Sequence, residues 1–134
     1  MASRDKKDLH NTLAIAYENA VVEYKRLYPN APQPFLTCTF RDNDEQNLLF
    51  LQKPKVTNAK GGESPHNYFP SLAFDLGFIT VAKKLDWAKG NFEKFAAIIT
   101  QIEPCIEWGG VWVKFVDFPH YQLKNWKIYL KAKI

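Results

Sequence analysis

Three residues of this chain could act together as a chemical site. Asp75 lies between two apolar residues in a segment that otherwise has the composition of a buried strand. Aspartate is depleted in strands and is rarely buried without a partner, so a cation is expected beside it. His66 precedes Asp75 by nine positions, and His120 lies near the end of the chain. The question is whether these side chains share a bound ion.

Each residue also has an ordinary explanation on its own. Asp75 could form a salt bridge with a lysine or arginine, and a single histidine is more often packed or exposed than a ligand. Together, two imidazoles and one carboxylate are a standard ligand set for Zn²⁺, and three protein ligands leave one tetrahedral position for water. Zinc lowers the pKa of that water towards about 7 and polarises a substrate carbonyl. The set therefore predicts a hydrolytic zinc site, whereas the remaining histidine, His10, is assigned no role.

Asp117 is the candidate proton carrier for such a site. It stands three residues before His120, and a carboxylate beside the metal can take the proton of water and pass it to a leaving amine. In an extended segment, side chains at an odd separation point to opposite faces. Both residues can therefore face one site only if Pro119 bends the chain.

Four short motifs resemble the M15-type, or VanY-like, zinc peptidases, with the nearest likeness to phage endolysins that act as L-alanyl-D-glutamate endopeptidases. The resemblance spans roughly residues 36 to 122. One interval, from His66 to Asp75, is two residues longer than the family's usual spacing, and we expect a bulge around Pro70 to absorb the difference. The motifs are Ser64-Pro65-His66, Ala73-Phe74-Asp75, Trp108-Gly109-Gly110 and Asp117-Phe118-Pro119-His120-Tyr121-Gln122.

The resemblance implies a role for each matched position. Arg41 lies in the segment TCTFRDNDEQ, which resembles the family's Ser-Gly-Tyr-Arg-Ser-x-x-Glu-Gln stretch. Its guanidinium would stabilise the developing oxyanion, and Asp117 would be the general acid/base. The zinc ligands would be His66, Asp75 and His120, and the substrate-binding residues would be Ser64, Trp108 and Gln122.

The elements that must position these residues can be predicted from apolar spacing. Apolar residues recur at helical spacing from Leu9 to Leu27, and Pro29 ends this helix. Residues 35–40 are typical of a strand. Asp42, with Glu45 three positions later, predicts a capped helix start, which puts Arg41 at a strand-to-helix turn.

The second half begins with a long polar loop over residues 53–70. Residues 72–79 then predict a strand, a second amphipathic helix begins at Asn91, and Pro104 ends it. The remaining residues are aromatic and β-branched, which predicts two or three strands. The class expected is α+β, with helices packed on a small antiparallel sheet, and the resemblance implies a hedgehog/D-Ala-D-Ala peptidase-like fold in one domain over residues 1–134.

Composition restricts the function classes further. The 134 residues are 46% hydrophobic and carry a formal net charge of +4, which suits a folded domain with a mildly basic surface. The sequence contains no run of 18 apolar residues, so no membrane span is predicted, and the N-terminus lacks the apolar core of a secretory signal. Cys38 and Cys105 are expected to be buried free thiols, although one disulfide stays possible.

The leading hypothesis is a zinc-dependent, endolysin-like peptidase acting on peptidoglycan stem peptides. It would be a monomer that binds no nucleic acid, makes no stable membrane association and accumulates in the host cytoplasm before reaching the wall. Two alternatives stay open. One is a D-Ala-D-Ala carboxypeptidase on the same scaffold, and the other is a non-enzymatic basic module that binds wall polymer or nucleic acid.

Overall fold

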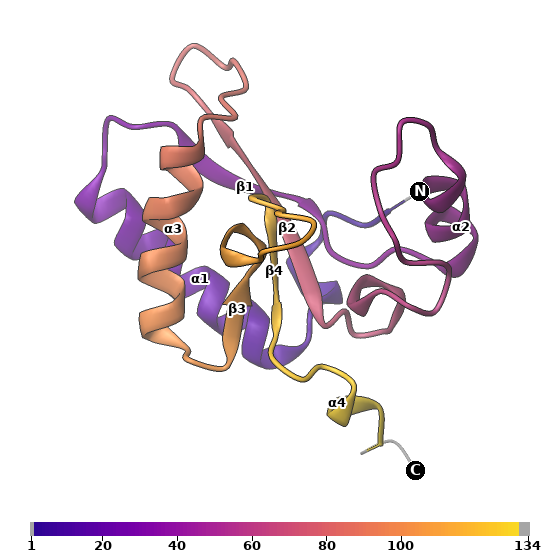
Figure 1. The fold of residues 1–134 in the computed structure, drawn as a ribbon. Coiled ribbons are helices and arrows are strands. Elements are labelled where there is room, and N and C mark those ends of the chain that lie inside the picture. The colour runs from indigo at the N-terminus through magenta and orange to yellow at the C-terminus, as the bar shows by residue number, and fades with distance from the viewer. Residues whose placement is uncertain (1, 132–134) are drawn as a thin grey trace.

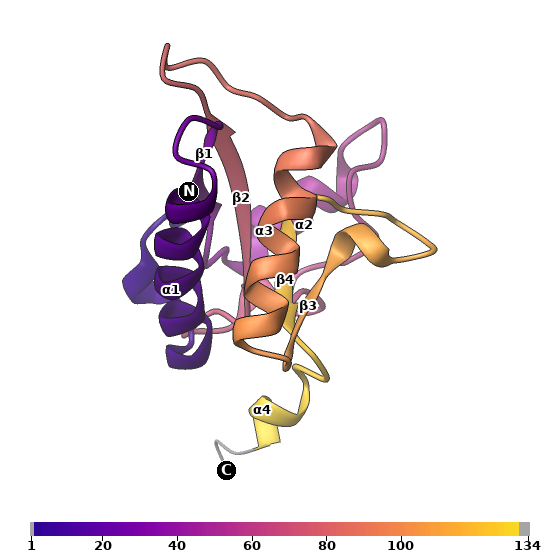
Figure 2. The same ribbon diagram turned by 90° about the vertical axis from the view of Figure 1, so that its left-hand side faces the viewer.

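Two amphipathic helices cover one face of the central sheet. The first, α1 (Asn11–Leu27), buries one stripe at helical spacing, and the second, α3 (Lys89–Ile102), ends just before Pro104 as predicted. The two helices pack against each other beside the strands in the computed structural model, which describes residues 2–131 (Figures 1 and 2). The helix α3 begins two residues before the predicted start at Asn91.

The sheet contains four antiparallel strands in the order β1-β2-β4-β3. Their bounds are Gln33–Cys38 for β1, Ala73–Ile79 for β2, Ile106–Trp108 for β3 and His120–Leu123 for β4. The α+β class with a small antiparallel sheet therefore agrees with the sequence prediction. The first strand starts and ends two residues earlier than the predicted range 35–40.

The sheet has one apolar face and one polar face. Phe74, Leu76 and Phe78 alternate along β2 and are fully buried beneath the helices, and the ring of Phe74 stacks on Tyr121 of β4 at 5.2 Å between centroids. Successive side chains of a strand point to opposite faces. Asp75 therefore faces away from this core, on the side of the sheet that α1 and α3 do not cover.

The polar face is bordered by α2 (Asn43–Leu51) and the long loop that follows it. Asp42 caps this helix, because its carboxylate accepts a hydrogen bond from the backbone N–H of Glu45 at 2.8 Å, as predicted. Figure 1 shows α2 and its loop on the opposite side of the strands from α1 and α3. The loop leads into η2 (Pro65–Asn67), one turn of 3₁₀ helix, and then into β2.

The C-terminal segment contains two strands, β3 and β4, in agreement with the predicted two or three, but it ends in a helix that was not predicted. After β4 the chain turns at Asn125, whose φ of 53° lies in the left-handed region, and it then forms the short helix α4 (Ile128–Lys131). A left-handed residue cannot continue a strand, which explains why pairing stops there. Residues 132–134 of the predicted domain lie outside the described part. Within the described part, no helix combines the length and apolar character needed to cross a bilayer.

Candidate metal centre

The register of the sheet brings Asp75 and His120 together. Asp75 of β2 pairs with His120 of β4 across the sheet, and on its other side it pairs with Cys38 of β1. Nδ1 of His120 lies 3.0 Å from Oδ1 of Asp75. Because directly paired residues of neighbouring strands point to the same face, this contact follows from the strand alignment.

His66 reaches the same carboxylate oxygen from outside the sheet. Its Nε2 lies 3.2 Å from Oδ1 of Asp75, and its ring centroid lies 5.2 Å from that of His120. The turn η2 holds it in place, because Ser64 caps the turn and accepts a hydrogen bond from the backbone N–H of His66 at 3.2 Å. The structure thus assembles the three residues that the sequence singled out, although they are up to 54 positions apart in the chain.

The spacing of these donor atoms suits zinc. Zinc binds imidazole nitrogen and carboxylate oxygen at about 2.0–2.2 Å, so two ligand atoms of a tetrahedral ion lie roughly 3.3 Å apart. The observed separations of 3.0 Å and 3.2 Å from Oδ1 of Asp75 to the two histidine nitrogens are close to this value. Each histidine nitrogen is therefore at a distance from Asp75 that a shared zinc ion would allow.

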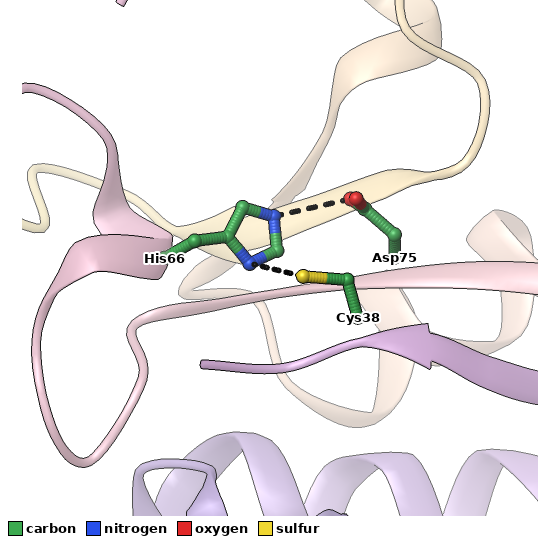
Figure 3. A group of neighbouring side chains, drawn as sticks. All are labelled: Cys38, His66 and Asp75. Atoms are coloured by element: carbon green, nitrogen blue, oxygen red, sulfur yellow. Dashed lines mark hydrogen bonds and ion pairs between the residues drawn. The ribbon is translucent and has the colours of Figure 1, made fainter. Parts of the chain in front are cut away.

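A second group of possible ligands shares two of these residues. Cys38, His66 and Asp75 have potential ligand atoms within 4.8 Å of one another. Figure 3 shows that Asp75 and Cys38 lie at different nitrogens of the His66 ring, and the Cys38 sulfur is 3.7 Å from Nδ1. From the sequence, Cys38 was expected only as a buried thiol, and the structure does place it in the buried part of the site as a free cysteine.

A backbone carbonyl decides which nitrogen of His66 is available. Nδ1 lies 2.7 Å from the carbonyl oxygen of Thr39, and a carbonyl can only accept a hydrogen bond, so Nδ1 carries a proton. Metal-binding histidines almost always donate their other ring N–H in this way. Nε2 is therefore the nitrogen left for a metal, which would displace its proton, and it faces Asp75 rather than Cys38. This arrangement favours the set His66, Asp75 and His120 over the set with the thiol.

The charges of the site are strongly coupled. Burial by itself would raise the pKa of Asp75, but the imidazoles of His66 and His120 outweigh it and hold the pKa of this carboxyl well below its usual range. Burial would lower the pKa of His66, and the negative charge of Asp75 outweighs this effect and raises the pKa to about 10. Without a metal, the proton on Nε2 of His66 therefore takes the place of the cation that Asp75 requires.

Asp117 reaches the cleft through a tight turn. The backbone N–H of His120 donates to the carbonyl of Asp117 at 3.2 Å, so the chain bends between them as expected from the sequence. Burial, followed by the charge of Asp75, raises the pKa of Asp117. Gly109 is needed here, because a Cβ atom at that position would lie 2.5 Å from the carbonyl oxygen of Asp117. The glycine of the Trp-Gly-Gly motif thus permits the close approach of the turn.

These side chains form the floor of an open cleft of about 540 Å³. This volume is within the range of sites for small molecules and short peptide segments. One wall comes from α2 and the loop after it, through Leu49 and Val56, and the other comes from the loop before β4, through Trp112 and Phe115. The cleft thus has apolar walls above a polar, charged floor.

The remaining predicted site residues divide into two groups. Arg41 and Ser64 line the cleft, and one guanidinium nitrogen of Arg41 lies 3.7 Å from Oδ2 of Asp75. Trp108, predicted to bind substrate, is instead 9% exposed, is not part of the cleft lining, and donates its indole N–H to the carbonyl of Phe118 at 2.7 Å. Side chains alternate between the two faces along β3, and Trp108 is on the face toward the core. Trp112, four residues later, lines the cleft instead.

Gln122, predicted to bind substrate, lies at the border of the cleft. It is only 8% exposed, and its side-chain amide is held between His120 and Glu107. Two neighbours of the site had no predicted role: Glu107, which accepts a hydrogen bond from the Gln122 amide, and Thr39, whose carbonyl accepts one from His66. The only signal for Glu107 was its position directly before the Trp-Gly-Gly motif.

A curated protein has a sequence similar to that of this chain. No family model matches the chain. A curated relative, the peptidoglycan L-alanyl-D-glutamate endopeptidase CwlK of Bacillus subtilis (strain 168), is 33% identical over 98 residues, in a match that covers 66% of this chain and 59% of the relative. This chain thus spans less than two thirds of that relative's length. The match confirms the predicted resemblance to this class of peptidase.

The fold has a solved counterpart. The L-Ala D-Glu endopeptidase ChiX of Serratia marcescens superposes with a TM-score of 0.71 at 19% sequence identity, and the match covers 96% of this chain and 92% of that one. The predicted fold class is therefore confirmed.

The choice between the two ligand sets can be tested with zinc affinity. We expect His120→Ala to abolish tight zinc binding, because it removes one of three ligands, and Cys38→Ala to change the affinity by less than an order of magnitude. The measurement is competition with a chromophoric chelator. The reverse order, with Cys38→Ala the damaging change, would show that the thiol is a ligand.

The raised pKa of His66 predicts how zinc affinity depends on pH. A free histidine is largely neutral above about pH 6.5, whereas His66 keeps its proton up to about pH 10. Zinc must displace this proton, so affinity should keep rising with pH above neutrality, by up to about tenfold per unit. Calorimetry at neutral pH in buffers of different ionisation enthalpy should detect the released proton. An affinity that levels off just above neutrality, without proton release, would contradict the raised pKa.

Proposed function

We propose that this chain is a zinc-dependent peptidase that hydrolyses the L-Ala–D-Glu bond of peptidoglycan stem peptides. The observation that carries the proposal is that ring nitrogens of His66 and His120 both approach Oδ1 of Asp75. Asp117 and Arg41 line the same cleft. The names of the two relatives supply the bond and the substrate class.

The zinc ion would be held by Nε2 of His66, a carboxylate oxygen of Asp75 and Nδ1 of His120. When bound, it would supply an activated water and polarise the scissile carbonyl. Thr39 keeps the ring of His66 oriented through its carbonyl, and Arg41 keeps a positive charge beside Asp75. The three ligands are held by two strands and a capped turn, so the site is largely formed before substrate binds.

Asp117 would carry the proton during the reaction. In this proposal its carboxylate takes a proton from the attacking water and returns it to the leaving amine of the D-Glu residue. A carboxyl group performs both steps best when its pKa lies near the working pH. The raised pKa of Asp117, caused first by burial and then by the charge of Asp75, is in the required direction.

Arg41 would stabilise the negative charge that develops on the carbonyl oxygen. One of its terminal nitrogens donates to Gln46 at 2.9 Å and the other lies near Asp75, so the guanidinium is fixed at the edge of the cleft. A fixed cation is effective because it need not reorganise as charge develops. Ser64 lines the same cleft, where we propose that it contacts the substrate as well as capping η2.

The finer parts of the sequence hypothesis stay predictions. They are the likeness to phage endolysins, the monomeric state, the absence of nucleic-acid binding and of stable membrane association, and release from a host cytoplasm. The proposed partner of the cleft is the peptidoglycan stem peptide. The carboxypeptidase alternative is less favoured, because both relatives are named as L-Ala–D-Glu endopeptidases.

Digestion of purified peptidoglycan tests the proposal directly. We expect the protein to release peptides with a new N-terminal D-Glu, and a chelator should stop the release until zinc is restored. Mass analysis of the products identifies the bond. Release of free D-Ala would support the carboxypeptidase instead, and binding to the wall without any release would support the non-enzymatic module.

The division of roles between Asp117 and the ligands predicts different defects. Asp117→Asn should bind zinc normally but lose turnover by about 10²–10⁴-fold, since it removes only the proton carrier. His120→Ala should lose both zinc and turnover. The measurements are metal content and the initial rate of peptide release. Equal loss of zinc in the two variants would refute the separate role of Asp117.

A further inference from the structure

We propose that Phe115 is a specificity-determining residue, whose ring forms an apolar subsite for the side chain of the L-Ala residue that precedes the scissile bond. The inference rests on the proposed function, because it assigns one part of that substrate to one part of the cleft. It starts from two observations on Phe115, namely a left-handed backbone conformation and an exposed ring in the cleft lining.

The loop that carries Phe115 is closed at its base by a single carbonyl group. The carbonyl oxygen of Gly109 accepts hydrogen bonds from the backbone N–H groups of Trp112 at 3.2 Å and Asp117 at 3.0 Å. The ring of Trp112 lies beside that of His120, with 5.3 Å between the centroids. Figure 2 shows the chain between β3 and β4 projecting from the strands. The base of this loop is therefore fixed at the metal centre, and residues 113–116 form its tip.

The backbone of Phe115 is in a conformation that disfavours its side chain. Among the described residues, three other than glycine have a positive φ, and they are Lys83, Phe115 and Asn125. The φ of Phe115 is 53°, and a bulky residue in this region is a genuine outlier. Such a conformation costs stability, and glycine would adopt it without that cost. Stability of the loop alone therefore does not explain a phenylalanine at this position.

Burial of the ring does not offset this cost. Phe115 is 55% exposed, and within the described residues it belongs neither to the hydrophobic core nor to the half-buried residues packed against it. It does line the cleft, two positions before Asp117. Local strain that is retained without a gain in packing is typical of residues that contact a ligand. The conformation thus keeps an apolar ring in the cleft and out of the core.

The chemistry of the cleft indicates which part of the substrate this ring contacts. The opposite wall is also apolar, through Leu49 and Val56, whereas the charged side chains lie on the floor. Of the two residues joined by the scissile bond, L-Ala carries a methyl group and D-Glu carries a carboxylate. A methyl group gains from leaving water for an apolar wall, and a carboxylate loses hydration there. The ring of Phe115 therefore suits L-Ala and not D-Glu.

A pair of peptides and three variants test this assignment. An N-acetylated stem peptide that begins with L-Ala–D-Glu is compared with the same peptide beginning with Gly–D-Glu. Phe115→Ala removes the ring but keeps a side chain at the strained position, and Phe115→Gly removes both. Val113→Ala is the matched control, because Val113 lies in the same loop, is 96% exposed and is outside the cleft lining.

The ratio of kcat/KM for the two peptides measures the contact with the methyl group. We expect the wild type and Val113→Ala to prefer the L-Ala peptide by about 4–10-fold, the effect of burying one methyl group. Both Phe115 variants should bring this ratio close to one, mainly through a higher KM for the L-Ala peptide. A ratio that stays at the wild-type value, or an equal loss for both peptides, would overturn the assignment.

Thermal unfolding separates substrate contact from a structural role of the ring. Phe115→Gly should unfold at a midpoint roughly 2–4 °C above that of Phe115→Ala, because only glycine adopts the positive φ without strain. It should also be at least as stable as the wild type. A midpoint for Phe115→Gly below that of the wild type would show that the ring supports the fold, which contradicts the proposal.

Peptide binding gives a readout that does not depend on turnover. In the zinc-loaded Asp117→Asn background, NMR titration with each peptide yields dissociation constants, and Phe115→Ala should remove the preference for L-Ala there as well. If the wild type cleaves neither peptide, the proposed function fails. The affinity ratio then still decides the role of Phe115, because an unchanged preference in Phe115→Ala would overturn it independently.

Discussion

The carboxylate of Asp75 is the charge around which the site is organised. It lies on a central strand with its side chain only 21% exposed, where a bare anion would be costly. Two imidazoles and one guanidinium surround it, and the contacts with the imidazoles account for its strongly lowered pKa. The same need for positive charge is met by a proton on His66 when no metal is present and would be met by zinc when it is bound.

The sheet separates stability from chemistry by its two faces. Along β2 the residues on either side of Asp75 are fully buried against α1 and α3, whereas Asp75 itself lies on the face bordered by α2. The strand β4 alternates in the same way, with Tyr121 in the core and His120 in the site. A shift of one residue in the pairing would exchange the two faces. The aromatic core thus specifies the register, and the register places the ligands.

The outer contacts of the two histidines show how closely the site is prepared for a metal. The carbonyl of Thr39 holds one ring, and the amide of Gln122 holds the other. Both arrangements direct a ring nitrogen at Asp75, Nε2 in His66 and Nδ1 in His120. Similarly, Gly109 lets the backbone of Asp117 pass closely enough for its carboxyl group to reach the cleft floor. Trp108 and Gly109 of the Trp-Gly-Gly motif therefore support the geometry of the site and do not line the cleft themselves.

The sequence by itself determined the order of the main elements, the α+β class and the identity of the residues that converge on Asp75. It could do so because a charged residue in an apolar strand requires a partner. The short motifs that contain His66, Asp75 and His120 also resemble those of a known peptidase family. It could not determine that Trp108 faces the core, or that the segment after β4 turns at Asn125 into a helix. It also could not assign Cys38, Thr39 and Glu107 to the surroundings of the site. Those contacts depend on cross-strand register and on the path of the loops, and tertiary packing alone decides which side chains distant in the chain become neighbours.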